Sequence, residues 1–305
     1  MQYIQNFLSM FSDKNFFKPW LSGLTDGDGT FVIVRKKDRP CSWYFIYKIS
    51  LFTPNAQLLY FVKQQLGAGT VSIEKDMVSY RMQDLKSLNL ILFPIFDTYP
   101  LLTVKQFRYE KFKKCLSVYE NNMLSIDTKN NLLATIWGEK LPDNYRSHVW
   151  MYYLNQEDFK AKVLKCETRY HSDPHLIISK PWLSGFVEAD GSFHLVKKSE
   201  SRIVHAFGIA QKEDLHLLKA ISVIFHIQAK IGYNKKKNYY TLSTTNSKCI
   251  ENIIQYFTGP TNISRTMQGI KSFEFRIWAW AYKKYKGDYQ KLHRIREIMR
   301  KLRKK

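Results

Sequence analysis

A chain of 305 residues, 45% of them hydrophobic, is long enough for one large domain or two ordinary ones and apolar enough to fill two cores. Forty-eight Lys and Arg against 26 Asp and Glu give a formal charge of +22, spread along the whole sequence, which favours a polyanionic partner. A membrane surface or a ribosome would also attract this charge, but the interleaved aromatic residues, 15% of the chain, favour a folded surface that binds nucleic acid.

The four cysteines, Cys41, Cys115, Cys166 and Cys249, are widely separated and form no C-x-x-C pair. This spacing indicates neither a zinc ribbon nor a disulfide framework, so we expect buried thiols in a reducing compartment. No apolar run approaches the length of a membrane span, and the first seventeen residues lack the Arg-rich, acid-free character of a transit peptide. We therefore expect a soluble, uncleaved chain with no membrane partner.

One phrase occurs twice in the sequence. PWLSGLTDGDGTF at residues 19–31 returns as PWLSGFVEADGSF at residues 181–193, and the longer alignment around them has ten identities in eighteen positions. Proline suits a first helical turn and glycine can end a helix. Each phrase therefore predicts a helix of about three turns, from Pro19 to Gly29 and from Pro181 to Gly191.

The segments after each phrase follow one order. The first copy continues with two strands (FVIVRKK, CSWYFIYKISL), a helix (AQLLYFVKQQLG), a hairpin (GTVSIEKDMVSYRM) and further helix, and the second with FHLVKK, RIVHAFGIAQ, DLHLLKAISVIFH and AKIGYNKKKNYYTLS. Strands are indicated by β-branched and aromatic residues bounded by Gly, Asp and Asn. The predicted fold class is α+β, with two αββαββα repeats at residues 1–117 and 179–305.

A connector is predicted between the repeats, at residues 118–178. It holds the polar, turn-rich segments ENNMLSIDTKNN, LPDNYRS and HSDPH around a helical stretch, HVWMYYLNQEDFKAKVLK. The C-terminal KLHRIREIMRKLRKK has helical spacing of Leu, Ile and Met and a dense basic face. That face suits either a solvated helix end or a phosphate contact.

Each predicted helix carries small residues four positions apart, which let two helix backbones approach closely: Gly23 and Gly27 in one, Gly185 and Ala189 in the other. If the helices cross as a pseudo-symmetric pair, their C-terminal ends bring two aspartates together at the negative ends of two helix dipoles. Two carboxylates about 5 Å apart at an effective dielectric of about 20 repel by roughly 3 kcal/mol. Such a place needs a cation, and oxygen ligands favour Mg²⁺.

The converging acids would be Asp28 and Asp190, the last acid of each phrase. Asp26 and Glu188, two residues earlier, would point off at another helical angle, and we interpret them as helix-end or interface carboxylates. Acids that only solubilise two packed helices are the alternative. An acid at the same terminal position of both copies, in a chain carrying +22, argues against it.

Both phrases resemble the LAGLIDADG motif, as LSGLTDGDG at residues 21–29 and LSGFVEADG at residues 183–191. Two copies in one chain resemble the single-chain LAGLIDADG homing endonucleases of the organellar, intron-encoded type. The likeness covers most of the chain apart from the connector and the extreme ends. It implies a β-saddle over the DNA duplex, with the motif helices at the interface between the repeats.

The resemblance also implies site residues. In that family the last acid of the motif binds the catalytic divalent metal and the carbonyl before it often assists, which implies Asp28 with Gly27 and Asp190 with Ala189. A lysine that begins a later helix belongs to the same site. The alignment of VKQFRYEKF with IKSFEFRIW implies Lys105 in the first repeat and Lys271 in the second, where each can hold solvent and neutralise developing phosphate charge.

A glutamine at the end of the second strand commonly positions the attacking water in that family. Gln211 fits this place in the second repeat, whereas the first repeat offers Leu51 or Phe52, depending on an apparent one-residue insertion. The departure puts equal cleavage of the two strands in doubt. We therefore expect a nicking bias.

The strands are expected to read DNA, because alternate side chains of a strand face the major groove. Phe31, Ile33, Phe193 and Leu195 suit the core. The residues expected to face DNA are Val32, Val34, Lys36, Lys48, Ser72 and Arg81 in the first repeat and His194, Val196, Lys198, Arg202, Lys230, Asn234 and Thr241 in the second.

The implied function is that of a monomeric, site-specific DNA endonuclease. With Mg²⁺ as cofactor, it would hydrolyse one phosphodiester on each strand of a long asymmetric site and initiate intron homing, and Ca²⁺ would support binding without cleavage. The expected location is the mitochondrion, with the chloroplast as an alternative. Two other functions stay open: a maturase that binds intron RNA, and a non-catalytic DNA-binding regulator of the same fold.

Overall fold

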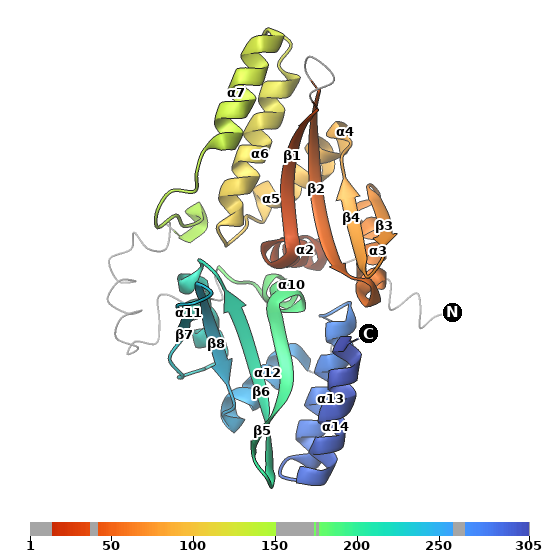
Figure 1. Ribbon diagram of the computed structural model, residues 1–305, viewed down its shortest axis with the longest axis vertical. Coiled ribbons are helices and arrows are strands. Elements are labelled where there is room, and N and C mark those ends of the chain that lie inside the picture. The colour runs from red at the N-terminus through yellow and green to blue at the C-terminus, as the bar shows by residue number, and fades with distance from the viewer. Residues whose placement is uncertain (1–13, 37–41, 151–173, 175–176, 259–265, 305) are drawn as a thin grey trace. The chain divides into compact units, whose positions relative to one another are not determined.

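The computed structural model describes residues 14–36, 42–150, 174, 177–258 and 266–304 (Figure 1). The chain divides into two compact units, Met1–Ser172 and Asp173–Lys305. Each unit is a mixture of helices and one four-stranded antiparallel sheet. The predicted α+β class and the order of elements in both repeats are confirmed.

The first unit runs from the first motif helix to a helical hairpin. Its elements are α2 (Lys14–Asp28), β1 (Gly29–Lys36), β2 (Ser42–Phe52), η1 (Thr53–Asn55), α3 (Ala56–Leu66), β3 (Thr70–Glu74), β4 (Met77–Met82), α4 (Leu85–Ser87), η2 (Leu88–Leu92), α5 (Phe93–Thr98), α6 (Lys105–Glu120) and α7 (Ile126–Gly138).

The second unit repeats this order. Its elements are α10 (Lys180–Asp190), β5 (Gly191–Ser199), β6 (Arg202–Gln211), α11 (Leu215–Ile224), β7 (Gly232–Asn234), β8 (Tyr239–Thr244), α12 (Ser247–Thr258), α13 (Ile270–Tyr285) and α14 (Tyr289–Lys304).

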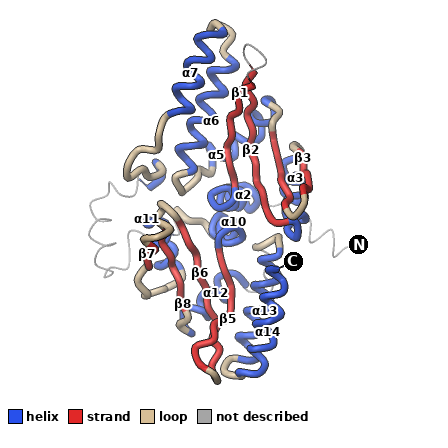
Figure 2. Tube along the Cα trace, in the orientation of Figure 1, coloured by secondary structure: helices blue, strands red, loops and turns tan. Residues whose placement is uncertain are grey.

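The two sheets have the same topology, with strand orders β1-β2-β4-β3 and β5-β6-β8-β7 (Figure 2). The register is also the same at the start, since Gly29 pairs with Ile49 and Gly191 with Ile209. A register irregularity between Lys197 and Ser199 is found in the second sheet. The repetition seen in the sequence therefore extends to backbone pairing.

Each core is organised around a phenylalanine three residues after the end of the motif helix. The Phe31 ring lies 5.4–5.8 Å from the rings of Tyr47, Phe96, Tyr109 and Phe112. Phe193 has equivalent neighbours, with ring distances of 5.0–6.2 Å to Phe207, Phe257, Phe275 and Trp278. Phe31, Ile33, Phe193 and Leu195 are all buried, as the alternation predicted.

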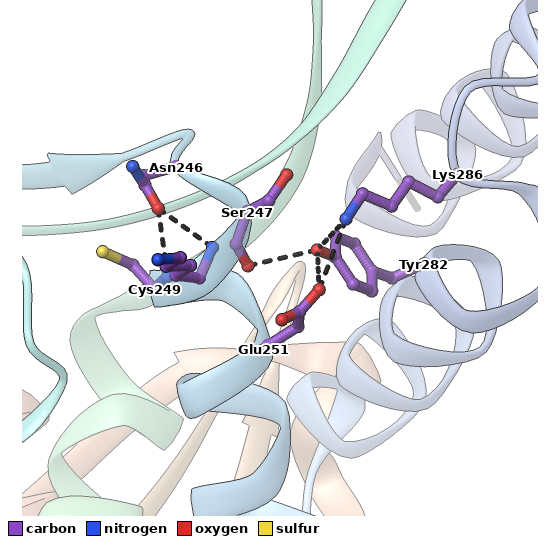
Figure 3. A network of polar contacts seen from close by, with 7 residues as sticks. Asn246, Ser247, Cys249, Glu251, Tyr282 and Lys286 are labelled. Carbon is purple, nitrogen blue, oxygen red and sulfur yellow. Dashed lines mark hydrogen bonds and ion pairs between the residues drawn. The ribbon is translucent and has the colours of Figure 1, made fainter.

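A polar network ties two helices of the second core together (Figure 3). The Tyr282 hydroxyl of α13 lies 2.8 Å from Glu251 Oε1 and 3.1 Å from the Ser247 carbonyl oxygen, both on α12. Lys286 Nζ donates to the same hydroxyl at 2.8 Å. Asn246 Oδ1 accepts the backbone N–H of Cys249 at 3.4 Å at the start of α12. The two Tyr282 bonds fix α12 against α13, the helix that carries Lys271.

The predicted start of the first motif helix is wrong, because α2 already includes Lys14 and Pro19 lies inside it. Proline has no backbone N–H to donate, so the helix loses a backbone hydrogen bond there. Near the start of a helix few such bonds are lost. In the second copy α10 starts at Lys180, with Pro181 in its first turn and Ser179 as the capping residue. Both helices end at the aspartate directly before the predicted glycine.

Part of the predicted connector packs on the first repeat. Helix α7 lies against α6, and Lys111 Nζ donates to the carbonyls of Trp137 and Glu139 at 2.7 and 2.6 Å. Trp150 Nε1 donates to the Leu102 carbonyl at 2.7 Å. The rest of the predicted helical stretch, from residue 151, lies outside the described residues, as do Cys41 and Cys166.

The C-terminal segment forms the predicted helix α14, whose buried face contains Leu292, Ile295 and Met299. Arg296 Nε donates to the Leu195 carbonyl at 3.1 Å, which fixes this helix to β5. Cys115 and Cys249 are buried and carry free thiols, as expected. Among the described helices, none is long and apolar enough to cross a membrane.

Candidate metal centre and nucleic-acid interface

Each motif helix passes directly into a strand, and its last residue is the predicted metal-binding aspartate. Asp28 and Asp190 are half-buried at the C-terminal ends of α2 and α10. A Cβ on Gly29 would lie 2.5 Å from Thr25 Cγ2 and 2.7 Å from Thr25 Cα, and one on Gly191 would lie 2.5 Å from Val187 Cγ1. Only glycine fits where the chain turns back against its own helix, and this turn fixes where each aspartate stands.

The aspartates offer hard oxygen donors at helix ends whose backbone dipoles favour a cation. In the second unit Gln211 Nε2 donates to Asp190 Oδ2 at 2.6 Å, so the structure brings these two predicted residues together. No group of three or more His, Cys, Asp and Glu side chains that could hold a metal ion occurs in the described parts of the chain. Within the described residues of each unit, the last residue of the motif helix is the one aspartate that supplies carboxylate oxygens at that helix end.

The two predicted lysines lie at the same helix ends. Lys105 is the first residue of α6, and its ammonium donates to the carbonyls of Thr25, at 3.1 Å, and Gly27. Lys271 is the second residue of α13, and its ammonium donates to the Gly191 carbonyl at 2.5 Å. Each ammonium therefore neutralises part of the negative end of its motif helix.

Asp26 and Glu188 make buried contacts that the sequence did not reveal. Asp26 is 2% exposed and accepts the backbone N–H groups of Leu102 at 2.8 Å and Thr103 at 3.1 Å, together with the Thr103 hydroxyl at 2.5 Å. Burial raises the pKa of Asp26 to about 6, although these hydrogen bonds and Lys105 act in the opposite direction.

Glu188 makes the equivalent contacts in the second unit. It is 7% exposed and accepts the N–H groups of Gln268 at 2.6 Å and Gly269 at 3.1 Å. Burial raises its pKa to about 7, while the two hydrogen bonds and Lys271 lower it. These partners are about 80 positions away along the chain, so local sequence patterns do not reveal them. The signal available was an acid at the same motif position in both copies.

The strand register identifies the first-repeat counterpart of Gln211. Because Ile49 and Ile209 hold equivalent pairings, the residue two positions later is Leu51 in one repeat and Gln211 in the other. The sequence left Leu51 and Phe52 open, and the register selects Leu51. Its half-buried side chain has no atom that can donate a hydrogen bond.

The predicted DNA-facing residues of the first unit lie on the sheet face opposite the core. Val32 on β1 and Lys48 on β2 lie between buried neighbours, Val34 and Lys36 continue the same face along β1, and Arg81 and Ser72 share this face. The face is hollowed where it is lined by Lys48, Ser50, Glu74, Lys75, Met77 and Ser79. Glu74 forms an ion pair with Arg81 at 3.4 Å.

In the second unit, the equivalent face carries His194, Val196, Arg202, Asn234 and Thr241. Lys198 lies at the register irregularity of β5, and Lys230 is an exposed residue just before β7. Tyr44, 36% exposed, was missed, and Lys36 Nζ lies 4.8 Å from its ring centre. Extending the alternation back along β2 from Lys48 finds it.

Comparison with known proteins gives a consistent picture. The sequence profile of the family described as LAGLIDADG endonuclease matches residues 21–116 and 183–282. The chain is 34% identical over 308 residues to the probable intron-encoded endonuclease Cox1-I1b of Schizosaccharomyces pombe, covering 98% of this chain and 72% of that protein. It is 28% identical to the probable intron-encoded endonuclease aI3 of Debaryomyces hansenii, covering 88% of this chain but only 39% of that protein.

Among solved structures, I-SmaMI, bound to an uncleaved DNA target in the presence of calcium ions, has the same fold. Its TM-score is 0.70 at 24% identity, covering 92% of this chain and 97% of that chain.

Proposed function

Because the chain belongs to the LAGLIDADG endonuclease family, we propose that it is a site-specific, Mg²⁺-dependent DNA endonuclease that starts intron homing. The observation that carries the proposal is the recurrence of one arrangement in both units. An aspartate ends each motif helix, and a lysine ammonium from a later helix binds at that same end. The similar I-SmaMI was solved with DNA and calcium ions, which supports a DNA substrate and a divalent cation.

The donor set fits a hard cation. Asp28 and Asp190 would hold Mg²⁺, assisted by the carbonyls of Gly27 and Ala189, because all of these ligands are oxygens. The Gly27 carbonyl already accepts a bond from Lys105, but a carbonyl oxygen has two lone pairs and can make a second interaction. Bound Mg²⁺ supplies a lower pKa for the attacking water and stabilises the leaving oxygen.

The chain's own residues bind and orient the DNA around these helix ends. The exposed faces of the two sheets would contact the duplex, with basic side chains on phosphates and others on base edges. Lys105 and Lys271 would neutralise charge that develops on the phosphates, and Gln211 would hold the attacking water through its amide. One chain supplies both repeats, so a monomer suffices, and the names of the relatives suggest a mitochondrial location.

The test is cleavage by Asp28→Asn and Asp190→Asn variants. The target is first obtained by selecting cleaved sites from a randomised DNA library with Mg²⁺. Each variant should then lose double-strand cleavage by at least about 100-fold, while binding to that target in Ca²⁺ stays near the wild-type level. Asp127→Asn, a change in an exposed acid of α7, is the matched control and should cut normally. Undiminished cutting by either motif variant would overturn the metal assignment.

A further inference from the structure

The buried acids Asp26 and Glu188 make the same contact in both repeats. Each accepts two backbone N–H groups, and in both units the donors lie three and two residues before the site lysine. Leu102 and Thr103 precede Lys105 in this way, and Gln268 and Gly269 precede Lys271. The contact recurs although one acid is a methylene longer than the other.

This contact holds the segment directly before each lysine-bearing helix, and the capping residue of neither helix makes a side-chain cap. The residues before α6 and α13 are Val104 and Gly269, which have no side-chain oxygen to cap a helix. By contrast, α7 and α10 are capped locally by Ser125 and Ser179. A local cap would avoid the free-energy cost of burying a carboxylate, which is on the order of several kcal/mol. The buried acid does what a local cap cannot, because it links the lysine's helix to the motif helix.

The link determines where the ammonium groups can reach. A lysine side chain is long and flexible, so its reach depends on where its helix starts. With the start of α6 bound to Asp26, the Lys105 ammonium reaches the carbonyls of Thr25 and Gly27 beside Asp28. With the start of α13 bound to Glu188, the Lys271 ammonium reaches the Gly191 carbonyl beside Asp190.

We propose that Asp26 and Glu188 are positioning residues that hold the Lys105 and Lys271 ammonium groups at the two metal-binding helix ends, each controlling cleavage of one DNA strand. This inference rests on the proposed function, because it assumes that the two lysines assist cleavage. In the first unit the Thr103 hydroxyl adds to the link, since it donates to Asp26 at 2.5 Å and accepts the Lys105 N–H at 3.2 Å. Gly269 stands in its place in the second unit.

The experiment is a double-mutant cycle with strand-resolved cleavage. Single-turnover rates with Mg²⁺ are measured on the selected target, whose two strands carry different fluorescent labels. Asp26→Asn should slow one strand about 10- to 100-fold, the same strand that Lys105→Ala slows, and should slow it little further when combined with Lys105→Ala. Glu188→Gln and Lys271→Ala should behave in the same way on the other strand.

Two controls separate positioning from loss of folding. Asp84 caps the short helix α4 by accepting the Ser87 N–H at 2.8 Å on the surface, and Asp84→Asn should leave both strand rates unchanged. If Asp26→Asn does not fold, Thr103→Val removes one hydroxyl from the link and should slow the same strand by a smaller factor. Binding in Ca²⁺ should stay at the wild-type level for every folded variant.

The outcomes are distinct. Equal slowing of both strands by Asp26→Asn would overturn the positioning role. So would a double variant whose loss of cleavage rate equals the product of the losses caused by Asp26→Asn and Lys105→Ala alone. Full-rate cleavage by Asp26→Asn, with Lys105→Ala slow, would overturn it while leaving the proposed lysine role intact. Full-rate cleavage by Lys105→Ala would refute the lysine role itself, and the positioning role with it.

Discussion

At the residue scale, the difference between Gln211 and Leu51 predicts unequal strand cleavage. The Gln211 amide contacts Asp190 at 2.6 Å, whereas Leu51 has no amide to offer in the first repeat. We expect nicked plasmid to accumulate when the wild-type protein cuts a supercoiled substrate. Gln211→Met keeps the side-chain length but removes the amide, and should slow the faster strand about 10- to 100-fold. Leu51→Met is the matched control. Equal first and second cleavage rates in the wild-type protein would contradict the asymmetry.

A second residue-scale prediction concerns His205, whose burial against the rings of Trp278 and Tyr282 lowers its pKa to about 4. In the unfolded chain a histidine takes up its proton near pH 6.5, whereas the folded protein resists protonation until about pH 4. The unfolded state therefore binds more protons in this window, and the free energy of unfolding falls as the pH decreases, by up to about 3 kcal/mol.

The measurement is urea unfolding at pH 7.5 and pH 5 for the wild-type protein and His205→Gln. Asp26 and Glu188 have raised pKa values and act in the opposite direction, so the difference between the two proteins isolates the histidine. The wild-type protein should lose more stability on acidification than His205→Gln does. An unchanged pH dependence in His205→Gln would refute the assignment.

At the element scale, the junction between motif helix and strand has no room for a side chain. Gly29→Ala would bring a Cβ within 2.7 Å of backbone at Thr25, so we expect a loss of about 1–3 kcal/mol in the free energy of unfolding. Gly208→Ala on β6 is the matched control, because its nearest neighbour would lie at 3.6 Å. That change should be neutral or slightly stabilising. Equal stability of the two variants in chemical unfolding would show that the junction can relax.

The elements also show what a sequence can and cannot predict here. Strand faces followed from alternation, because Phe31 and Phe193 must be buried and their neighbours then point outward. The start of α2 was predicted wrongly, because Pro19 was interpreted as a residue of the first helical turn. The buried face of the helix in fact continues before Pro19, to Phe17. The partners of Asp26 could not be predicted, because a contact between residues 76 positions apart depends on how helices pack.

At the scale of the whole molecule, a charge of +22 should make DNA binding strongly dependent on salt. Six of the side chains expected on the sheet faces are basic: Lys36, Lys48, Arg81, Lys198, Arg202 and Lys230. If each neutralises one phosphate, the logarithm of the binding constant should fall with the logarithm of salt concentration with a slope of about −5. Fluorescence anisotropy with a labelled duplex in Ca²⁺, between 50 and 200 mM salt, measures this slope.

Single substitutions test whether this charge acts through the sheet faces or through the surface in general. Lys48→Ala, on the hollowed face of the first sheet, should make the slope shallower by about one. Lys63→Ala removes the same charge from the exposed side of α3, whose buried residues Leu59 and Val62 face the core, and should leave the slope unchanged. If both variants shift the slope equally, the phosphates respond to net charge alone, and the exposed sheet faces are not the surface that binds DNA.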